Sequence, residues 1–172
     1  GSGHLVKTIH NGIEYAEMQL LAELYSYLRY AQNLNPDKIA DIFEEWNLAS
    51  ECSYLLEITS KILRKKEDNN WLIDIILDQA GNKGTGNWAS IIALESGYPA
   101  SMINAALLAR YFSTIKNSYN IHKNKETASL KNLLSIEVLL KAYSLARAIN
   151  HFQGIKYLES FKDFNLNTKE IA

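Results

Sequence analysis

The sequence has a single cysteine and only two prolines among its 172 residues. One cysteine, Cys52, cannot form a disulfide within the chain or a cysteine-rich zinc site. It suits a reducing compartment, so we expect a cytoplasmic location, with Cys52 packed as a small apolar residue. The scarcity of proline and of glycine, which occurs eight times, favours long helices over many short strands.

Other absences exclude whole classes of function. No apolar run reaches the roughly 18 residues that a transmembrane helix needs, and the N-terminus lacks the features of a signal peptide. Eighteen basic and 19 acidic residues give a net charge of −1, so neither nucleic acid nor a membrane is an expected partner. No histidine or cysteine lies at zinc-ligand spacing from His10, so no metal is expected. The 47% apolar composition does allow a sizeable core.

Helical periodicity covers most of the chain, with apolar residues recurring at three- and four-residue spacing. Asn35-Pro36 is a typical helix start, with the asparagine as N-cap and the proline at the first helical position. Gly154 is expected to be a weak point inside the last helix. The short apolar run 71–77 fits either a strand or a helical turn. The sequence predicts a single all-α domain, with helices over residues 5–31, 36–46, 53–63, 88–95, 99–113 and 130–161.

The first predicted helix carries a polar stripe opposite its apolar face. Helical spacing places five residues on this stripe, namely Lys7, His10, Asn11, Glu14 and Tyr15. An ordinary solvated face is one interpretation; a face turned toward a cleft is the other. In a cleft, Lys7 is a candidate proton acceptor. Glu14, about 10 Å further along the helix axis, would act at the other end of a small substrate.

Two further features suit an anion. The segment Gly81-Asn82-Lys83-Gly84-Thr85-Gly86 lacks the residue order of a P-loop or a dinucleotide fingerprint. Its backbone N–H groups, lysine and hydroxyl nevertheless precede a helix, which suits a phosphate, with a flexible connector as the alternative. Arg110 lies in an apolar segment and, if buried, needs an intramolecular carboxylate or a ligand phosphate as its partner.

Three stretches point beyond these local patterns: GHLVKTIHNGIEY at residues 3–15, ILDQAGNKGTGNW at residues 76–88, and Ala109-Arg110. Together they resemble the C-terminal, all-helical domain of the 6-phosphogluconate dehydrogenase family. The resemblance is clear over about residues 1–116 and weaker beyond. The chain departs from the family pattern at three positions, which are Ala49 in place of glycine, Glu51 in place of leucine and Asn87 in place of lysine.

The resemblance implies a role for each matching residue. Lys7 matches the base that takes the proton of the substrate's C3 hydroxyl and then, as an ammonium, polarises the new carbonyl while carbon dioxide leaves. Glu14 matches the acid that protonates the resulting enediol. The substrate-binding matches are His10 and Asn11 for the hydroxyls, with Asn11 also near the nicotinamide, and Tyr15, Lys83, Thr85 and Arg110 for the phosphate.

The resemblance also implies what the chain lacks by itself. In the family, an NADP-binding Rossmann domain precedes the matching segment. A C-terminal tail that completes the partner subunit's site follows it. We therefore expect residues 1–172 to be the substrate-binding and dimerisation domain, truncated before that tail.

The enzyme implied by the resemblance is an NADP-dependent 6-phosphogluconate dehydrogenase of the pentose phosphate pathway. It would be a homodimer that converts 6-phosphogluconate, a phosphorylated sugar acid, to ribulose 5-phosphate. The chain alone would be inactive, because NADP is bound mainly by the absent domain. A relative of the β-hydroxyacid dehydrogenases and a non-catalytic helical dimerisation module are the alternatives.

Overall fold

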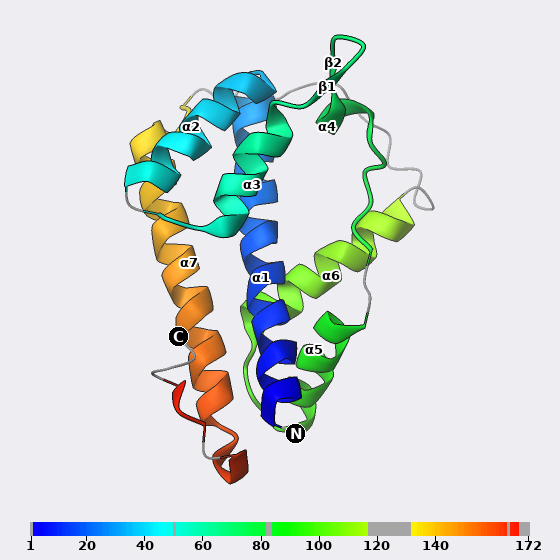
Figure 1. The fold of residues 1–172 in the computed structure, drawn as a ribbon, viewed down its shortest axis with the longest axis vertical. Coiled ribbons are helices and arrows are strands. Elements are labelled where there is room, and N and C mark those ends of the chain that lie inside the picture. The colour runs from blue at the N-terminus through cyan, green and yellow to red at the C-terminus, as the bar shows by residue number, and fades with distance from the viewer. Residues whose placement is uncertain (1, 50, 82–83, 117–131, 165, 169–172) are drawn as a thin grey trace. The chain divides into compact units, whose positions relative to one another are not determined.

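The computed structural model describes residues 2–49, 51–81, 84–116, 132–164 and 166–168, and their regular structure is almost entirely helical (Figure 1). The predicted all-α class is confirmed. A short hairpin pairs β1 (Lys66–Glu67) with β2 (Asn70–Trp71) in antiparallel register. The helical elements are α1 (Ser2–Ser26), the π-helical η1 (Tyr27–Ala31), α2 (Pro36–Ala49), α3 (Tyr54–Leu63), α4 (Leu72–Ile75), α5 (Thr85–Glu95), α6 (Ser101–Ile115), α7 (Ile136–Glu159) and the 3₁₀ turn η3 (Lys162–Phe164).

The predicted helix starts are confirmed where a capping side chain marks them. The Asn35 side-chain oxygen accepts a hydrogen bond from the Lys38 backbone N–H at 2.9 Å. Ser53 caps α3 by accepting from the Leu56 N–H at 3.4 Å. The apolar run 71–77 was predicted as either a strand or a helical turn, and it contains both: Trp71 is the last residue of β2, and α4 follows it. The helix predicted over 130–161 is α7, but its predicted start is wrong: residues 132–135 are not helical and α7 begins at Ile136, while residues 130 and 131 lie outside the described residues.

Cys52 is exposed, so the expectation that it packs in the core is wrong. The physical reason lies in the neighbouring cap. Ser53 is buried and has extended backbone dihedrals, because its hydroxyl must reach the first turn of α3. Among the described residues, no helix combines the length and apolarity needed to cross a membrane, and no group of three or more His, Cys, Asp or Glu side chains could hold a metal ion.

The chain forms two compact units, and every predicted site residue belongs to the first. This unit consists of residues 1–19, 79–120 and 145–172, and the second unit consists of residues 20–78 and 121–144. The core of the first unit includes Ile9, Ile103 and Tyr157. The Tyr157 hydroxyl donates to the Ala89 carbonyl at 2.8 Å. Packing of α1 against α5, α6 and α7 therefore fixes the helix that carries the polar stripe.

Gly154 is a close-packing position in the first unit, so its prediction as a weak point in the last helix is wrong. It is buried within α7, where a Cβ atom would lie 2.2 Å from Cδ1 of Ile13. The absent side chain lets α7 lie close against α1. One turn earlier, the Asn150 side-chain amide donates to the Ile13 carbonyl at 2.8 Å. The buried Glu17 carboxylate of α1 lies 3.3 Å from the Arg147 guanidinium, so α7 holds α1 by both packing and polar contacts.

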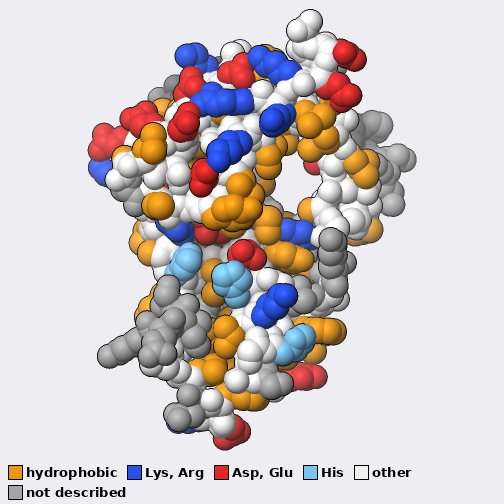
Figure 2. All heavy atoms as spheres, viewed as in Figure 1, with side chains coloured by type: hydrophobic (Ala, Val, Ile, Leu, Met, Phe, Trp, Pro, Cys, Tyr) orange, Lys and Arg blue, Asp and Glu red, His pale blue; other side chains and the backbone are white. Residues whose placement is uncertain are grey.

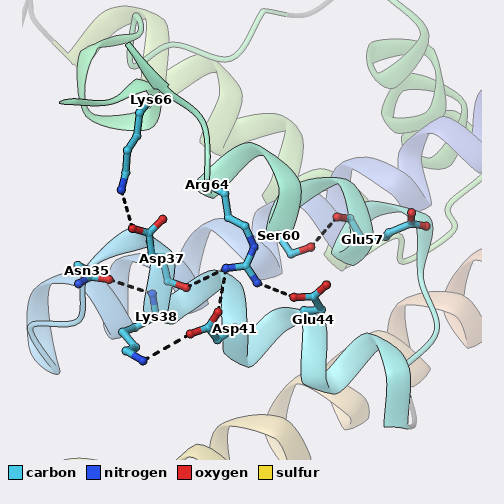
Figure 3. Close-up of polar contacts among 9 residues, drawn as sticks. All are labelled: Asn35, Asp37, Lys38, Asp41, Glu44, Glu57, Ser60, Arg64 and Lys66. Atoms are coloured by element: carbon cyan, nitrogen blue, oxygen red, sulfur yellow. Dashed lines mark hydrogen bonds and ion pairs between the residues drawn. The ribbon is translucent and has the colours of Figure 1, made fainter. Parts of the chain in front are cut away.

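In the second unit, exposed ion pairs join α2 to the end of α3 and to the hairpin (Figure 3). Arg64 lies 2.8 Å from Asp41 and 2.5 Å from Glu44, while Lys66 lies 2.8 Å from Asp37. The hydrogen bond from Lys66 lowers the pKa of Asp37, and the hydrogen bond from Arg64 lowers the pKa of Asp41. The network therefore makes stability depend on pH.

We expect the variant Arg64→Met to lose stability at pH 7 and to lose progressively less as the pH falls below about 3.9, the pKa of an unfolded aspartate. A carboxyl group with a lowered pKa in the folded protein contributes stability above its unfolded pKa, about 3.9 for aspartate. That stability disappears as the pH falls through the folded pKa. Because the pairs are exposed, the effect is small and shrinks in salt. Urea denaturation of both proteins across this pH range measures it, and an equal difference at both ends would contradict the prediction.

Candidate functional site

The polar stripe predicted for the first helix lies on the N-terminal half of α1. Its apolar counterpart is buried, with Leu5 and Ile9 in the core of the first unit. In the space-filling view, histidine, lysine and acidic side chains adjoin one another on the surface over this part of α1 (Figure 2). The exposed members of the stripe are Lys7 and His10, and its half-buried members are Asn11, Glu14 and Tyr15.

The stripe places an amine and a carboxyl group on one helical face. Lys7 is exposed, and its side chain makes no hydrogen bond or ion pair with the part of the chain that the structure describes, so its amino group is available to a ligand. Glu14 lies two turns further along, with a carboxylate oxygen 3.3 Å from Nε2 of His10. That contact is an ion pair when the imidazole is protonated. The separation of the two residues along the helix axis is about 10 Å.

The second half of the site is built around Arg110 of α6. Its guanidinium carbon lies 3.6 Å from the centroid of the Tyr15 ring. Nη1 donates to the Gly81 carbonyl at 2.8 Å, and Nη2 donates to the Met18 sulfur at 3.5 Å. The structure therefore brings together two of the predicted phosphate ligands, which are 95 positions apart in the sequence.

No carboxylate among the described residues pairs with Arg110, although the guanidinium is half-buried. The alternative of an intramolecular carboxylate is therefore wrong within this part of the chain. A backbone carbonyl, a thioether and an aromatic ring orient the guanidinium without neutralising its charge. A partly desolvated cation without a counter-ion favours the binding of an anion.

The glycine-rich segment 81–86, here called the glycine loop, runs into α5, which begins at Thr85 and not at the predicted Trp88. Gly84 is the N-cap residue and has a φ of 101°, a backbone conformation that favours glycine. The N-terminal end of an 11-residue helix attracts negative charge. Lys83 and the side chain of Thr85 lie outside the described residues, so their roles stay predictions.

Three groups around Arg110 were not predicted as parts of the site. They are the Met18 sulfur, the Gly81 carbonyl and the Ser113 hydroxyl. Ser113 accepts a hydrogen bond from the Ala80 N–H at 2.9 Å and donates to the Arg110 carbonyl at 2.7 Å, which ties the start of the glycine loop to α6. Met18 was detectable in principle, because it follows Tyr15 by three residues and shares its helix face.

Comparison with known proteins assigns the family. The family model "6-phosphogluconate dehydrogenase, C-terminal domain" matches residues 3–172. The chain is 42% identical over 183 residues to a 6-phosphogluconate dehydrogenase, decarboxylating, of Bacillus licheniformis, covering all of this chain and 39% of that protein. A relative from Bacillus subtilis, named as NAD(+)-dependent, is 41% identical over 183 residues, with the same coverage of both chains.

A solved structure shares the fold. It is the Plasmodium falciparum 6-phosphogluconate dehydrogenase, described in its apo form, with its cofactor NADP+ and with its substrate 6-phosphogluconate. The TM-score is 0.85 at 37% identity, over 97% of this chain and 38% of that chain. The chain thus spans 39% of the length of the curated relatives named above. With a family model that covers residues 3–172 and a shared helical fold, this chain belongs to the 6-phosphogluconate dehydrogenase family and corresponds to its C-terminal domain.

Proposed function

We propose that this chain is the substrate-binding and catalytic domain of an NADP-dependent, decarboxylating 6-phosphogluconate dehydrogenase of the cytoplasmic pentose phosphate pathway. The observation that carries the proposal is the setting of Arg110. A half-buried guanidinium is oriented by Tyr15, Met18 and Gly81 but has no carboxylate partner among the described residues. Its planar fork of N–H donors matches the oxygens of a phosphate group.

In this proposal the two ends of the site bind the two ends of 6-phosphogluconate. Arg110 and Tyr15 bind the phosphate, together with Lys83 and Thr85 at the N-terminal end of α5, where the helix dipole favours negative charge. The stripe on α1 binds the sugar acid, with His10 and Asn11 as hydrogen-bonding partners of its hydroxyl groups. The substrate is thereby oriented before any proton moves.

The proton transfers are assigned to the two ends of the α1 stripe. The neutral amine of Lys7 accepts the proton of the C3 hydroxyl as C3 is oxidised to a ketone. The resulting ammonium donates a hydrogen bond to the new carbonyl oxygen, which takes up electron density as the bond to the carboxyl carbon breaks and carbon dioxide leaves. Glu14 then donates a proton to the carbon that lost the carboxyl group, the enediolate oxygen beside Lys7 becomes a carbonyl again, and the product is the ketone ribulose 5-phosphate.

NADP is proposed to bind mainly outside this chain. Dinucleotides are held by a parallel sheet with a glycine-rich turn, whereas the strands among the described residues are one antiparallel pair of two residues each. When bound, NADP supplies the hydride acceptor. Asn11 of the stripe is half-buried between the two catalytic candidates, and we propose that it lies near the nicotinamide.

A homodimer is part of the same proposal. Two helices of the first unit expose apolar side chains at helical spacing, for example Leu108 and Phe112 on α6, and Leu145 and Phe152 on α7. Their exposed fractions range from 54% to 64%. We propose that a second copy of the chain covers these side chains in the homodimer.

The proposed function is tested by the substrate preference of a full-length protein that contains this chain. We expect it to oxidise 6-phosphogluconate with release of carbon dioxide. Its kcat/KM should exceed that for gluconate by roughly tenfold or more, the value of one charge-assisted hydrogen bond. The 172-residue chain with the same substrate and NADP should give no sustained NADPH formation. Equal use of gluconate or of a phosphate-free β-hydroxyacid would contradict the proposal, as would a full-length protein without dehydrogenase activity.

A further inference from the structure

The Tyr15 ring lies directly against the backbone of the first turn of α5, at Gly86. Gly86 is buried, and a Cβ atom there would lie 2.4 Å from Cε2 and 2.8 Å from Cδ2 of Tyr15. Carbon atoms in favourable contact are about 3.5–4.0 Å apart. Any side chain at position 86 would therefore displace the ring or the helix by about 1 Å.

Backbone conformation does not explain this glycine. The glycines with positive φ among the described residues are Gly84 and Gly97, so Gly86 has a φ that any residue adopts. Inside a helix, glycine is also less favourable than alanine by about 1 kcal/mol. Glycine at position 86 leaves room for the Tyr15 ring, and any larger residue would occupy that space.

The same ring determines where the guanidinium of Arg110 lies. The guanidinium carbon is 3.6 Å from the ring centroid, and Nη1 donates to the Gly81 carbonyl at 2.8 Å. Gly81 and Gly86 are the two ends of the glycine loop. The Tyr15–Arg110 pair thus contacts the loop at both ends, and a displacement of the ring at Gly86 moves the guanidinium relative to the loop.

We propose that Gly86 is a positioning residue of the phosphate site. Its missing side chain fixes the place of the Tyr15 ring, and the ring fixes the direction in which Arg110 presents its N–H groups. This inference rests on the proposed function, because it assumes that Arg110 and Tyr15 bind the substrate's phosphate. Gly86 acts through Tyr15 and not by contact with the substrate.

The chain offers two matched glycine controls on α1. A Cβ atom at Gly12 would lie 2.9 Å from Cγ2 of Ile103 and 3.3 Å from Cβ of Ala89, so alanine there disturbs apolar packing in the same unit. A Cβ atom at Gly3 would have nothing within 4 Å. Gly12→Ala therefore reports on a general loss of packing, and Gly3→Ala reports on the substitution itself.

The test compares these variants in the full-length enzyme through KM, kcat and melting temperature. We expect Gly86→Ala to raise KM for 6-phosphogluconate by about 10- to 100-fold, since a displacement of about 1 Å at a binding site has effects up to this size. KM for gluconate should stay nearly constant, because gluconate has no phosphate. Gly12→Ala should lower the melting temperature without a selective rise in KM, and Gly3→Ala should change neither.

A double-mutant cycle with Tyr15→Ala separates positioning from packing. Without the ring, the methyl group of Gly86→Ala has nothing to displace, so we expect it to add no further rise in KM. An equal rise with and without the ring would overturn the proposal. If Gly86→Ala does not fold, restoration of folding by Tyr15→Ala supports the contact, and failure of that rescue overturns it. A failure of the proposed function can be told apart from a failure of this inference. In that case the enzyme without any substitution would show no preference for 6-phosphogluconate over gluconate.

Discussion

Replacement of Lys7 by methionine is expected to lower kcat for 6-phosphogluconate by roughly 10³-fold in the full-length enzyme, within the range for loss of a general acid–base group. One amine serves twice in the proposed reaction, first as proton acceptor and then as hydrogen-bond donor to the new carbonyl. The fold should be unaffected, because Lys7 is exposed and makes no polar contact with the described residues. Methionine also keeps an unbranched, flexible stem. NADPH formation at saturating substrate and the melting temperature measure the two effects.

The matched control for this variant is Lys141→Met. Lys141 lies on the exposed face of α7 in the second unit, where its ammonium is 2.6 Å from the Glu137 carboxylate at helical i,i+4 spacing. The same change in charge and shape there removes only a surface ion pair, whose contribution is small. We expect kcat to stay within about twofold. A Lys7→Met enzyme with a near-normal rate would remove Lys7 from the mechanism.

Helices were predictable where the signal is local. Asn35 and Ser53 cap their helices in the structure because a short polar side chain satisfies the N–H groups of a first turn whatever surrounds it. The run 71–77 stayed ambiguous because the switch from hairpin to α4 depends on a turn. In that turn, Asp68 and Asn69 both adopt positive φ. Spacing of apolar residues carries no information about such a turn.

The site was predictable along one helix and less so between helices. The five stripe residues share a face of α1 because the helical period fixes their directions. The setting of Arg110 depends on Tyr15 and Gly81, which are 95 and 29 positions away in sequence. From the sequence alone, either a carboxylate of the chain or a ligand phosphate could be the partner of Arg110. Tertiary packing alone shows that neutral groups hold the guanidinium.

Glycine was the residue type whose role the sequence indicated least. Gly154 and Gly86 both sit within helices, where their low helical preference suggests weak points. In the structure each makes room for a side chain of α1, Ile13 in one case and Tyr15 in the other. A glycine that weakens a helix and a glycine that allows a close contact cannot be distinguished in the sequence. The neighbours that a Cβ atom would meet in the folded chain distinguish the two cases.

Arg110→Met is the second variant with a large expected effect, and it tests the phosphate site directly. Loss of the guanidinium should raise KM for 6-phosphogluconate by roughly 10- to 100-fold, because a hydrogen bond to a charged group contributes about 1.5–3 kcal/mol. KM for gluconate should change much less. Arg110→Lys should recover part of the affinity, since it restores the charge but not the planar fork of donors that lies over Tyr15.

Arg64→Met is the matched control, because it removes the same charge from the second unit, where Arg64 pairs with Asp41 and Glu44. It should leave KM for both substrates within about twofold, since exposed ion pairs contribute little. Parallel measurement of KM for 6-phosphogluconate and for gluconate separates recognition from structure. If Arg110→Met raised KM equally for both substrates, the role of Arg110 would be only to hold the Gly81 carbonyl and the Tyr15 ring in place. A selective loss for the phosphorylated substrate requires that the guanidinium, which no described carboxylate neutralises, meets the phosphate.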